Sequence, residues 1–123
     1  MAERRCLRCG MSTTAARFEL DQAPPRRKCP KCDDELYRQH DGRFLTRDIA
    51  HGRETVARAM QKLDELLLDG WRGYSRGVRI IVGGGLIRSE VLGQLRYYRE
   101  RGIVRAYGED SPNRGAIVVT LRD

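Results

Sequence analysis

The sequence predicts a mixed α/β protein in two units, a small cysteine-bearing ribbon at residues 1–40 and a two-layer domain at residues 41–123. The ribbon is predicted because two Cys-x-x-Cys pairs stand in a segment with few large apolar side chains. The domain is predicted because aliphatic blocks with strand and helix periodicity follow from about residue 44. Their order is β-α-β-α-β-β. Right-handed crossovers then favour a four-stranded mixed sheet, with the first three strands mostly parallel, the last antiparallel and two helices on one face.

The ribbon contains all four cysteines of the chain, Cys6 and Cys9 in the first pair and Cys29 and Cys32 in the second. Residues 10–28 separate the two pairs. This is the ligand spacing of a tetrahedral zinc site, because each Cys-x-x-Cys turn offers two thiolates at a suitable separation. A closed four-thiolate site has no open coordination position, so the expected cofactor is a structural Zn²⁺. Such an ion also supplies the stability that so few apolar side chains cannot.

Two other interpretations of the cysteines are weaker. Disulfides need an oxidising compartment, but residues 1–9 are charged and lack the apolar stretch of a secretory signal. A redox Cys-x-x-Cys motif normally occurs as a single pair beside a βαβ unit. The chain also has no apolar run near the roughly 18 residues of a membrane span, so we expect a soluble cytoplasmic protein.

The strands of the domain are predicted from short β-branched and aliphatic runs. Residues 44–49 form the first candidate, and residues 78–82, Val-Arg-Ile-Ile-Val, end in three glycines as a buried strand does when it enters a turn. Two further strands are expected at residues 103–107 and 116–121. The intervening residues 109–115 are rich in turn formers and predict a wide hairpin loop.

Two helices are expected between these strands. Residues 54–69 carry one apolar stripe at helical spacing, which predicts core packing, and Gly70 follows as a stop. Residues 89–101 place a second, shorter apolar stripe on one face, with Gly102 as the C-terminal stop.

The formal net charge of +7 points to a polyanionic partner. Four thiolates on one Zn²⁺ reduce this charge to about +5, which is still basic. Arginine supplies most of the 24 basic residues, and its planar guanidinium gives bidentate phosphate contacts. A genome that favours arginine codons is an equally good explanation of that preference. Clusters of basic residues beside the two Cys-x-x-Cys turns, which we call the knuckles, are a better indication of a polyanionic partner. Folding around the metal is expected to bring these residues together: Arg4, Arg5, Arg8, Arg26, Arg27 and Lys28.

Four stretches of the domain occur in an order that identifies a family resemblance. They are His51-Gly52, Ala59-Met60-x-x-Leu63-Asp64-x-Leu66, Val78-Arg79-Ile80-Ile81 with a glycine loop and Leu86-Ile87-Arg88-x-x-Val91, and Gly115 to Leu121. Together they resemble the Smr domain, the small module at the C-terminus of some MutS-like proteins. The resemblance implies a two-layer α/β fold and nucleic-acid binding. In some members it implies endonuclease activity on DNA or RNA, while others act near ribosomes.

The resemblance and the basic clusters together give the expected site residues. In the cleavage hypothesis His51 deprotonates the attacking water or 2′-hydroxyl, Asp48 orients its ring, and Arg53 and Arg88 neutralise the phosphate. Cleavage would use a divalent metal such as Mg²⁺. The residues expected to bind nucleic acid are Gly52, Arg53, Gly83, Gly84, Gly85, Arg26, Arg27 and Lys28.

The chain departs from the family at two positions. Ile49 stands where the family has an acid two residues before the histidine, and Val82 stands where the second motif has its own histidine. The glycines remain, and their amides can approach a phosphate at a helix N-terminus. The sequence therefore supports binding better than catalysis.

Two other function classes remain as alternatives. A nucleotide-binding enzyme is disfavoured, because Arg88 stands where a dinucleotide fingerprint starting at Gly83 needs its third glycine. A non-catalytic zinc-ribbon adaptor would bind RNA, the ribosome or a protein partner, with aromatic side chains that either stack on bases or belong to the core: Phe18, Tyr37, Trp71 and Tyr74.

Overall fold

The structure is a computed structural model that describes residues 3–22, 24–110 and 113–123. It contains the predicted mixed α/β domain, with two helices and a four-stranded mixed sheet. The strands are β3 (Phe44–Asp48), β4 (Gly77–Ile81), β5 (Ala106–Asp110) and β6 (Asn113–Thr120). Their order across the sheet is β3-β4-β6-β5. β3 and β4 are parallel, and β6 lies antiparallel between β4 and β5.

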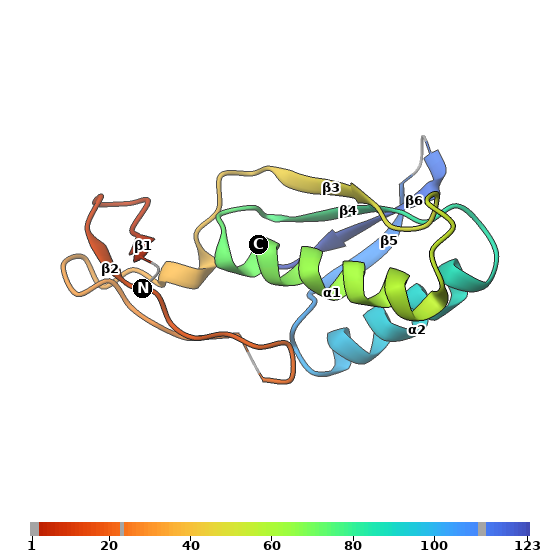
Figure 1. Ribbon diagram of the computed structural model, residues 1–123. Coiled ribbons are helices and arrows are strands. Elements are labelled where there is room, and N and C mark those ends of the chain that lie inside the picture. Colours follow the sequence, from red (N-terminus) through yellow and green to blue (C-terminus); the bar gives the residue numbers. More distant parts are fainter. Residues whose placement is uncertain (1–2, 23, 111–112) are drawn as a thin grey trace.

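Both helices cover the same face of this sheet (Figure 1). Helix α1 (Val56–Arg72) begins where the Thr55 side chain accepts a hydrogen bond from the amide of Arg58. Helix α2 (Leu86–Glu100) begins directly after the glycine loop. The buried stripes of both helices meet the sheet in one apolar core, which includes Leu63, Leu67 and Leu95. This packing is the reason for the helical periodicity of the sequence.

The N-terminal unit forms at one end of this domain. It contains a short antiparallel pair, β1 (Glu3–Arg5) and β2 (Ser12–Thr14), and a single 3₁₀ turn, η1 (Leu36–Arg38). Figure 1 shows it beside the start of β3 and the C-terminal end of α1. The chain between the knuckles is anchored in the main core, where Phe18 and Leu20 are buried and the Phe18 ring lies 5.6 Å from that of Trp71.

Gly70 does not end the first helix, so that prediction was wrong. The helix continues to Arg72, and Gly70 is buried within it. A Cβ atom built on Gly70 would lie 2.6 Å from Cδ1 of Leu121. The glycine is therefore a packing feature of the helix. Gly102, by contrast, follows α2 with a left-handed φ of 77°, as expected of a helix stop.

Three further boundaries differ from the prediction. Helix α2 starts three residues before the expected Ser89, at Leu86. Residues 103–105 precede β5, because Ile103 and Val104 are held as a buried loop whose amides both donate to the carbonyl of Tyr98. The wide hairpin loop at residues 109–115 is also wrong, because all but two of these residues extend β5 and β6; residues 111 and 112 lie outside the described chain.

Candidate metal centre and candidate nucleic-acid interface

The four cysteine sulfurs converge between the two knuckles. All four Sγ atoms lie within 4.8 Å of one another, with 3.6 Å between those of Cys6 and Cys32 and 3.4 Å between those of Cys9 and Cys29. A tetrahedral ion with Zn–S bonds of about 2.3 Å places neighbouring sulfurs about 3.8 Å apart. The sulfurs therefore fit a metal ion such as zinc.

The two knuckles share one backbone pattern. The carbonyl of the first cysteine accepts from the amide four residues later, Gly10 onto Cys6 and Asp33 onto Cys29, at 2.8 Å in each case. That fourth residue has a left-handed φ in both turns, 81° at Gly10 and 65° at Asp33. Each knuckle thus presents its two thiols by the same turn, which suits one shared ion.

Gln39 supports the sulfur of Cys6 from outside the ligand set. Its Nε2 donates to Cys6 Sγ at 3.3 Å, and its Oε1 accepts from the Leu7 amide at 2.7 Å. The bond from Gln39, followed by those from the amides of Cys9 and Arg8, outweighs the effect of burial and lowers the pKa of the Cys6 thiol to about 6. Thiolate is the form that binds a metal, so this contact favours metal binding.

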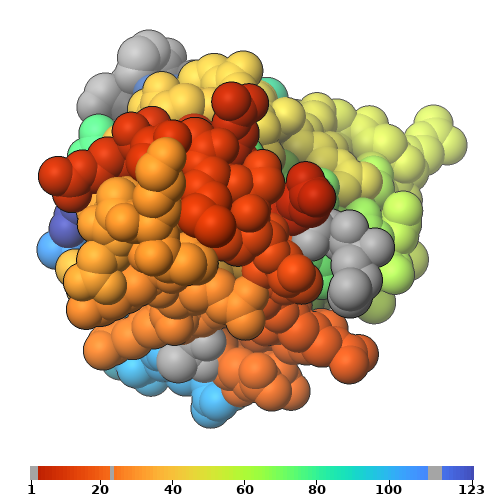
Figure 2. All heavy atoms as spheres, turned by 90° about the vertical axis from the view of Figure 1, so that its left-hand side faces the viewer, coloured from red at the N-terminus to blue at the C-terminus, as the bar shows by residue number. Residues whose placement is uncertain are grey.

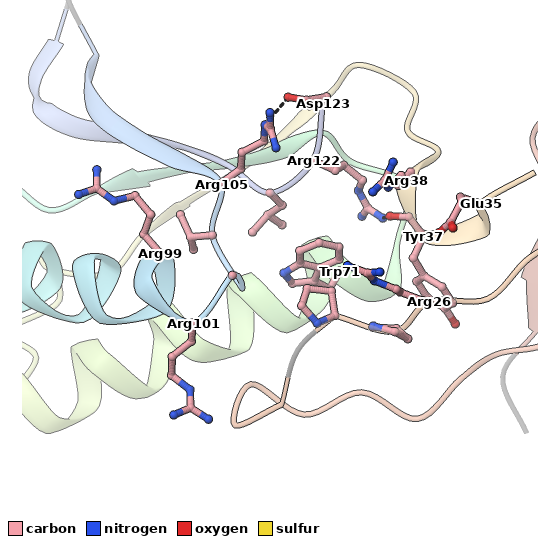
Figure 3. Close-up of a pocket in the computed structure, with 15 residues that line it drawn as sticks. Arg26, Glu35, Tyr37, Arg38, Trp71, Arg99, Arg101, Arg105, Arg122 and Asp123 are labelled. Atoms are coloured by element: carbon pink, nitrogen blue, oxygen red, sulfur yellow. Dashed lines mark hydrogen bonds and ion pairs between the residues drawn. The ribbon is translucent and has the colours of Figure 1, made fainter.

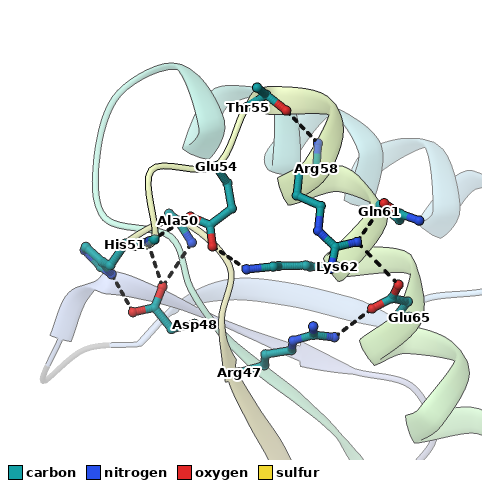
Figure 4. Close-up of polar contacts among 11 residues, drawn as sticks. Arg47, Asp48, Ala50, His51, Glu54, Thr55, Arg58, Gln61, Lys62 and Glu65 are labelled. Carbon is teal, nitrogen blue, oxygen red and sulfur yellow. Dashed lines mark hydrogen bonds and ion pairs between the residues drawn. The ribbon is translucent and has the colours of Figure 1, made fainter.

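At the end of the sheet that lies away from the cysteine cluster, the predicted residues Asp48 and His51 contact each other. Asp48 ends β3, and one carboxylate oxygen lies 2.6 Å from Nδ1 of His51 while the other accepts from the amides of Ala50 and His51 (Figure 4). Burial raises the pKa of Asp48, but these hydrogen bonds outweigh that effect and keep it below its ordinary value. The carboxylate thus fixes the ring and directs Nε2 away from itself.

The glycine loop lies beside that ring. Asp48 is paired in register with Ile81, so the loop after β4 starts next to the turn after β3. A Cβ atom on Gly83 would lie 3.4 Å from Nε2 of His51. The Gly83 amide already donates to the carbonyl of Gly115, so the free backbone donors of the loop are those that follow it. No described residue accepts from the amides of Gly84 and Gly85.

The charges at this end nearly balance. Arg88 pairs with Glu109, and Asp48 pairs with His51. Glu54 is engaged by the Gly52 amide and by Lys62, and its carboxylate fills the space where a Cβ on Gly52 would lie (Figure 4). Arg53, in the same turn, makes no ion pair with any described residue. Val82 is buried in the core, so its position offers no reacting group.

The structure does not bring the knuckle arginines to this end. Arg26, Arg27 and Lys28 belong to the N-terminal unit, which Figure 1 shows at the other end of the molecule from the point where β3 ends. Arg27 donates to the carbonyl of Thr14, and Lys28 lies 3.8 Å from Asp33. The basic cluster and the glycine loop are therefore separate surfaces.

Two arginines are structural. Arg4, expected in the basic cluster, is buried between the rings of Tyr37 and Tyr74 and donates to the carbonyls of Leu36, Arg72 and Gly73. Arg122 is buried likewise and donates to four carbonyls: those of Tyr37, Gly70, Gly73 and Ser75. Both guanidinium groups thus stabilise the carboxyl end of α1, where the helix dipole is negative.

The aromatic side chains considered for base stacking are mostly in the core. Phe18, Tyr37 and Trp71 are each 5% exposed or less, and Trp71 Nε1 donates to the carbonyl of Ile103. Tyr74 is half-buried beneath Arg4. These rings pack the molecule and do not form an open stacking platform.

Sequence reasoning missed a second group of cations, because they come from three distant segments. A cavity of about 830 Å³ between the N-terminal unit and the domain is lined by six arginines (Figure 3): Arg26, Arg38, Arg99, Arg101, Arg105 and Arg122. Only Arg26 was expected to bind a ligand. No local motif links residues 26 and 38 to residues 99–105, so only the folded chain reveals the group.

Comparison of the chain with protein families, with characterised proteins and with solved structures finds no match. The resemblance to the Smr domain therefore stays a prediction. Within the described residues, neither helix has the length and apolar character needed to cross a membrane.

Proposed function

We propose that this protein binds nucleic acid, and that it contacts a phosphate of the sugar–phosphate chain where β3 and β4 end. The observation that carries the proposal is the His51 ring, held by Asp48 at 2.6 Å and placed beside the glycine loop at the start of α2. The amides of Gly84 and Gly85 and the exposed Arg53 supply donors for an anionic oxygen. In this proposal Zn²⁺ at the four cysteines is structural.

Binding can be tested by titrating labelled DNA and RNA at several salt concentrations. We expect affinity to fall steeply with salt, and Arg53→Gln to reduce the slope of log K against log salt by about 1. Arg43→Gln is a matched control, because Arg43 is an exposed arginine at the other end of β3. Binding that is insensitive to salt would instead indicate the adaptor alternative, with a protein partner.

Phosphodiester cleavage is a second candidate, and the Asp48–His51 pair specifically favours it. A carboxylate on Nδ1 leaves Nε2 able to accept a proton from water or a 2′-hydroxyl. Hairpin, nicked and single-stranded substrates, with and without Mg²⁺, test this candidate. We expect His51→Ala to abolish cleavage while binding persists. Unchanged cleavage by His51→Ala would remove His51 from the reaction.

A further inference from the structure

The arginine-lined cavity separates the N-terminal unit from the domain, and we call it the arginine groove. Residues 24–26 and 35–38 form one wall, and residues 99–105 and 121–123 form the other. Figure 2 looks onto this end, where the orange atoms of the N-terminal unit lie next to light-blue atoms from the end of α2. The groove is therefore made by tertiary contact and lies far from the Asp48–His51 pair.

The groove has a large excess of positive charge. Its lining contains six arginines and two acidic residues, Glu35 and Asp123, which gives a formal charge of +4. Figure 3 shows the guanidinium groups of Arg99 and Arg101 directed away from Trp71. Asp123 pairs with Arg105. Arg26, Arg38 and Arg99 have no carboxylate within ion-pair distance among the described residues, and all three are exposed. Arg99 Cζ lies 5.2 Å from the centroid of the Tyr107 ring, and no described residue accepts a hydrogen bond from its guanidinium, so its N–H donors remain available to a ligand.

A buried cation adds to the potential at the floor of the groove. Arg122 is 3% exposed, and its partners among the described residues are neutral carbonyls. Burial, followed by the nearby charge of Arg4, lowers the pKa of Arg122 to about 10, so the group is still charged at neutral pH. A charge in a low-dielectric wall is poorly screened and attracts an anion strongly.

The size and lining of the groove select the ligand. Its volume of about 830 Å³ lies in the range that holds one drug-sized ligand, about 300–1,000 Å³, so a few nucleotides fit but a duplex does not. Trp71 and Tyr37 at the floor are 5% exposed and offer little ring surface for stacking. Recognition would therefore depend on phosphates and would be nearly independent of sequence.

We propose that the arginine groove binds the sugar–phosphate backbone of single-stranded nucleic acid. The inference rests on the proposed nucleic-acid binding, but it assigns a second site, at the opposite end of the molecule, with its own preference for single strands. Arginine suits this ligand because its guanidinium contacts two phosphate oxygens at once.

The test is the affinity of a mixed-sequence labelled oligonucleotide, single-stranded or annealed, for the double variant Arg38→Gln/Arg99→Gln. These two side chains come from opposite walls and pair with no described carboxylate, so their loss leaves no charge unpaired. We expect single-strand affinity to fall at least about tenfold and the salt slope to fall by about 1 to 2. Tripolyphosphate should displace the oligonucleotide. Arg96→Gln, on the same helix but outside the groove, should stay within about twofold of the unchanged protein.

The outcomes separate the two sites. Equal affinity of the double variant and the control for the single strand contradicts nucleic-acid binding in the groove. If Arg53→Gln still weakens binding in that case, the proposed contact at the glycine loop stands. A loss of affinity in the double variant but not in Arg53→Gln supports binding in the groove and contradicts the proposed phosphate contact at the glycine loop. Equal loss on single strands and duplex overturns the single-strand assignment. Absence of nucleic-acid binding by the unchanged protein overturns both proposals.

Discussion

At the scale of single residues, arginine has two distinct roles in this protein. Arg4 and Arg122 are buried and donate to backbone carbonyls at the carboxyl end of α1. Arg26, Arg38 and Arg99 are exposed and have no described carboxylate partner. The sequence pattern does not distinguish these roles, since Arg4 precedes Arg5 in what reads as one basic cluster.

Replacing the buried Arg122 tests the structural role. Arg122→Met keeps much of the side-chain volume but leaves several buried carbonyls without a donor, each costing about 1–3 kcal/mol. We expect the free energy of unfolding to fall by about 3 kcal/mol or more, as measured by urea denaturation. Arg105→Met is the control, because that exposed ion pair contributes at most about 1 kcal/mol. Equal midpoints for the two variants would contradict the assignment.

The predicted catalytic residues also differ in their dependence on the fold. Asp48 and His51 are three positions apart and contact each other within one turn, so their contact can be predicted from the local sequence. Arg88 was expected to face the same phosphate, but it pairs with Glu109 from β5. Its partner lies on a distant strand, which no local motif specifies.

At the scale of elements, periodicity predicted the helices and strands, but boundaries depended on tertiary contacts. The apolar periodicity of α1 predicts its buried face correctly. It does not predict that Gly70 lies inside the helix, because close packing against Leu121 leaves no signal in the neighbouring sequence. In the same way Ile103 and Val104 look like strand residues, because a buried loop needs the same apolar side chains as a buried strand.

Two glycine substitutions separate packing from helix propensity. Gly77 lies in the central strand β4, where a Cβ atom would lie 2.0 Å from the carbonyl oxygen of Val119 and 2.7 Å from the Phe44 ring. We expect Gly77→Ala to destabilise the protein by at least about 3 kcal/mol, since backbone must move. Gly93→Ala, in α2, meets nothing within 4 Å and should stabilise by up to about 1 kcal/mol. Thermal denaturation compares both, and a stable Gly77→Ala protein would show that the strands are not packed this closely.

At the scale of the whole molecule, the cluster of four cysteines lies behind one wall of the arginine groove. Residues 24–26 and 35–38 flank Cys29 and Cys32, and they have few apolar contacts of their own beyond Leu36 and Tyr37. The opposite wall belongs to the domain core. Metal binding should therefore affect the groove much more than the sheet.

Zinc removal tests this dependence. A chelator should expose residues 26–31 to trypsin and lower single-strand affinity at least about tenfold, while amide protection in β4 and β6 persists. The same treatment of Arg38→Gln/Arg99→Gln should cause a smaller further loss, because metal and arginines act through one surface. Equal losses in both proteins would mean that the groove does not depend on the metal.

The sequence by itself determined the two cysteine pairs as a candidate metal site, the α/β composition and the Asp48–His51 pair, because each depends on residues close together in the chain. Cys-x-x-Cys turns, apolar periodicity and a strand-end turn are all local signals. Only the tertiary structure decided the strand order, the burial of Arg4 and Arg122, and the arginine groove. These features bring together residues that lie up to about a hundred positions apart, such as Arg26 and Arg122, and the energy that selects such contacts comes from packing, which no short stretch of sequence expresses.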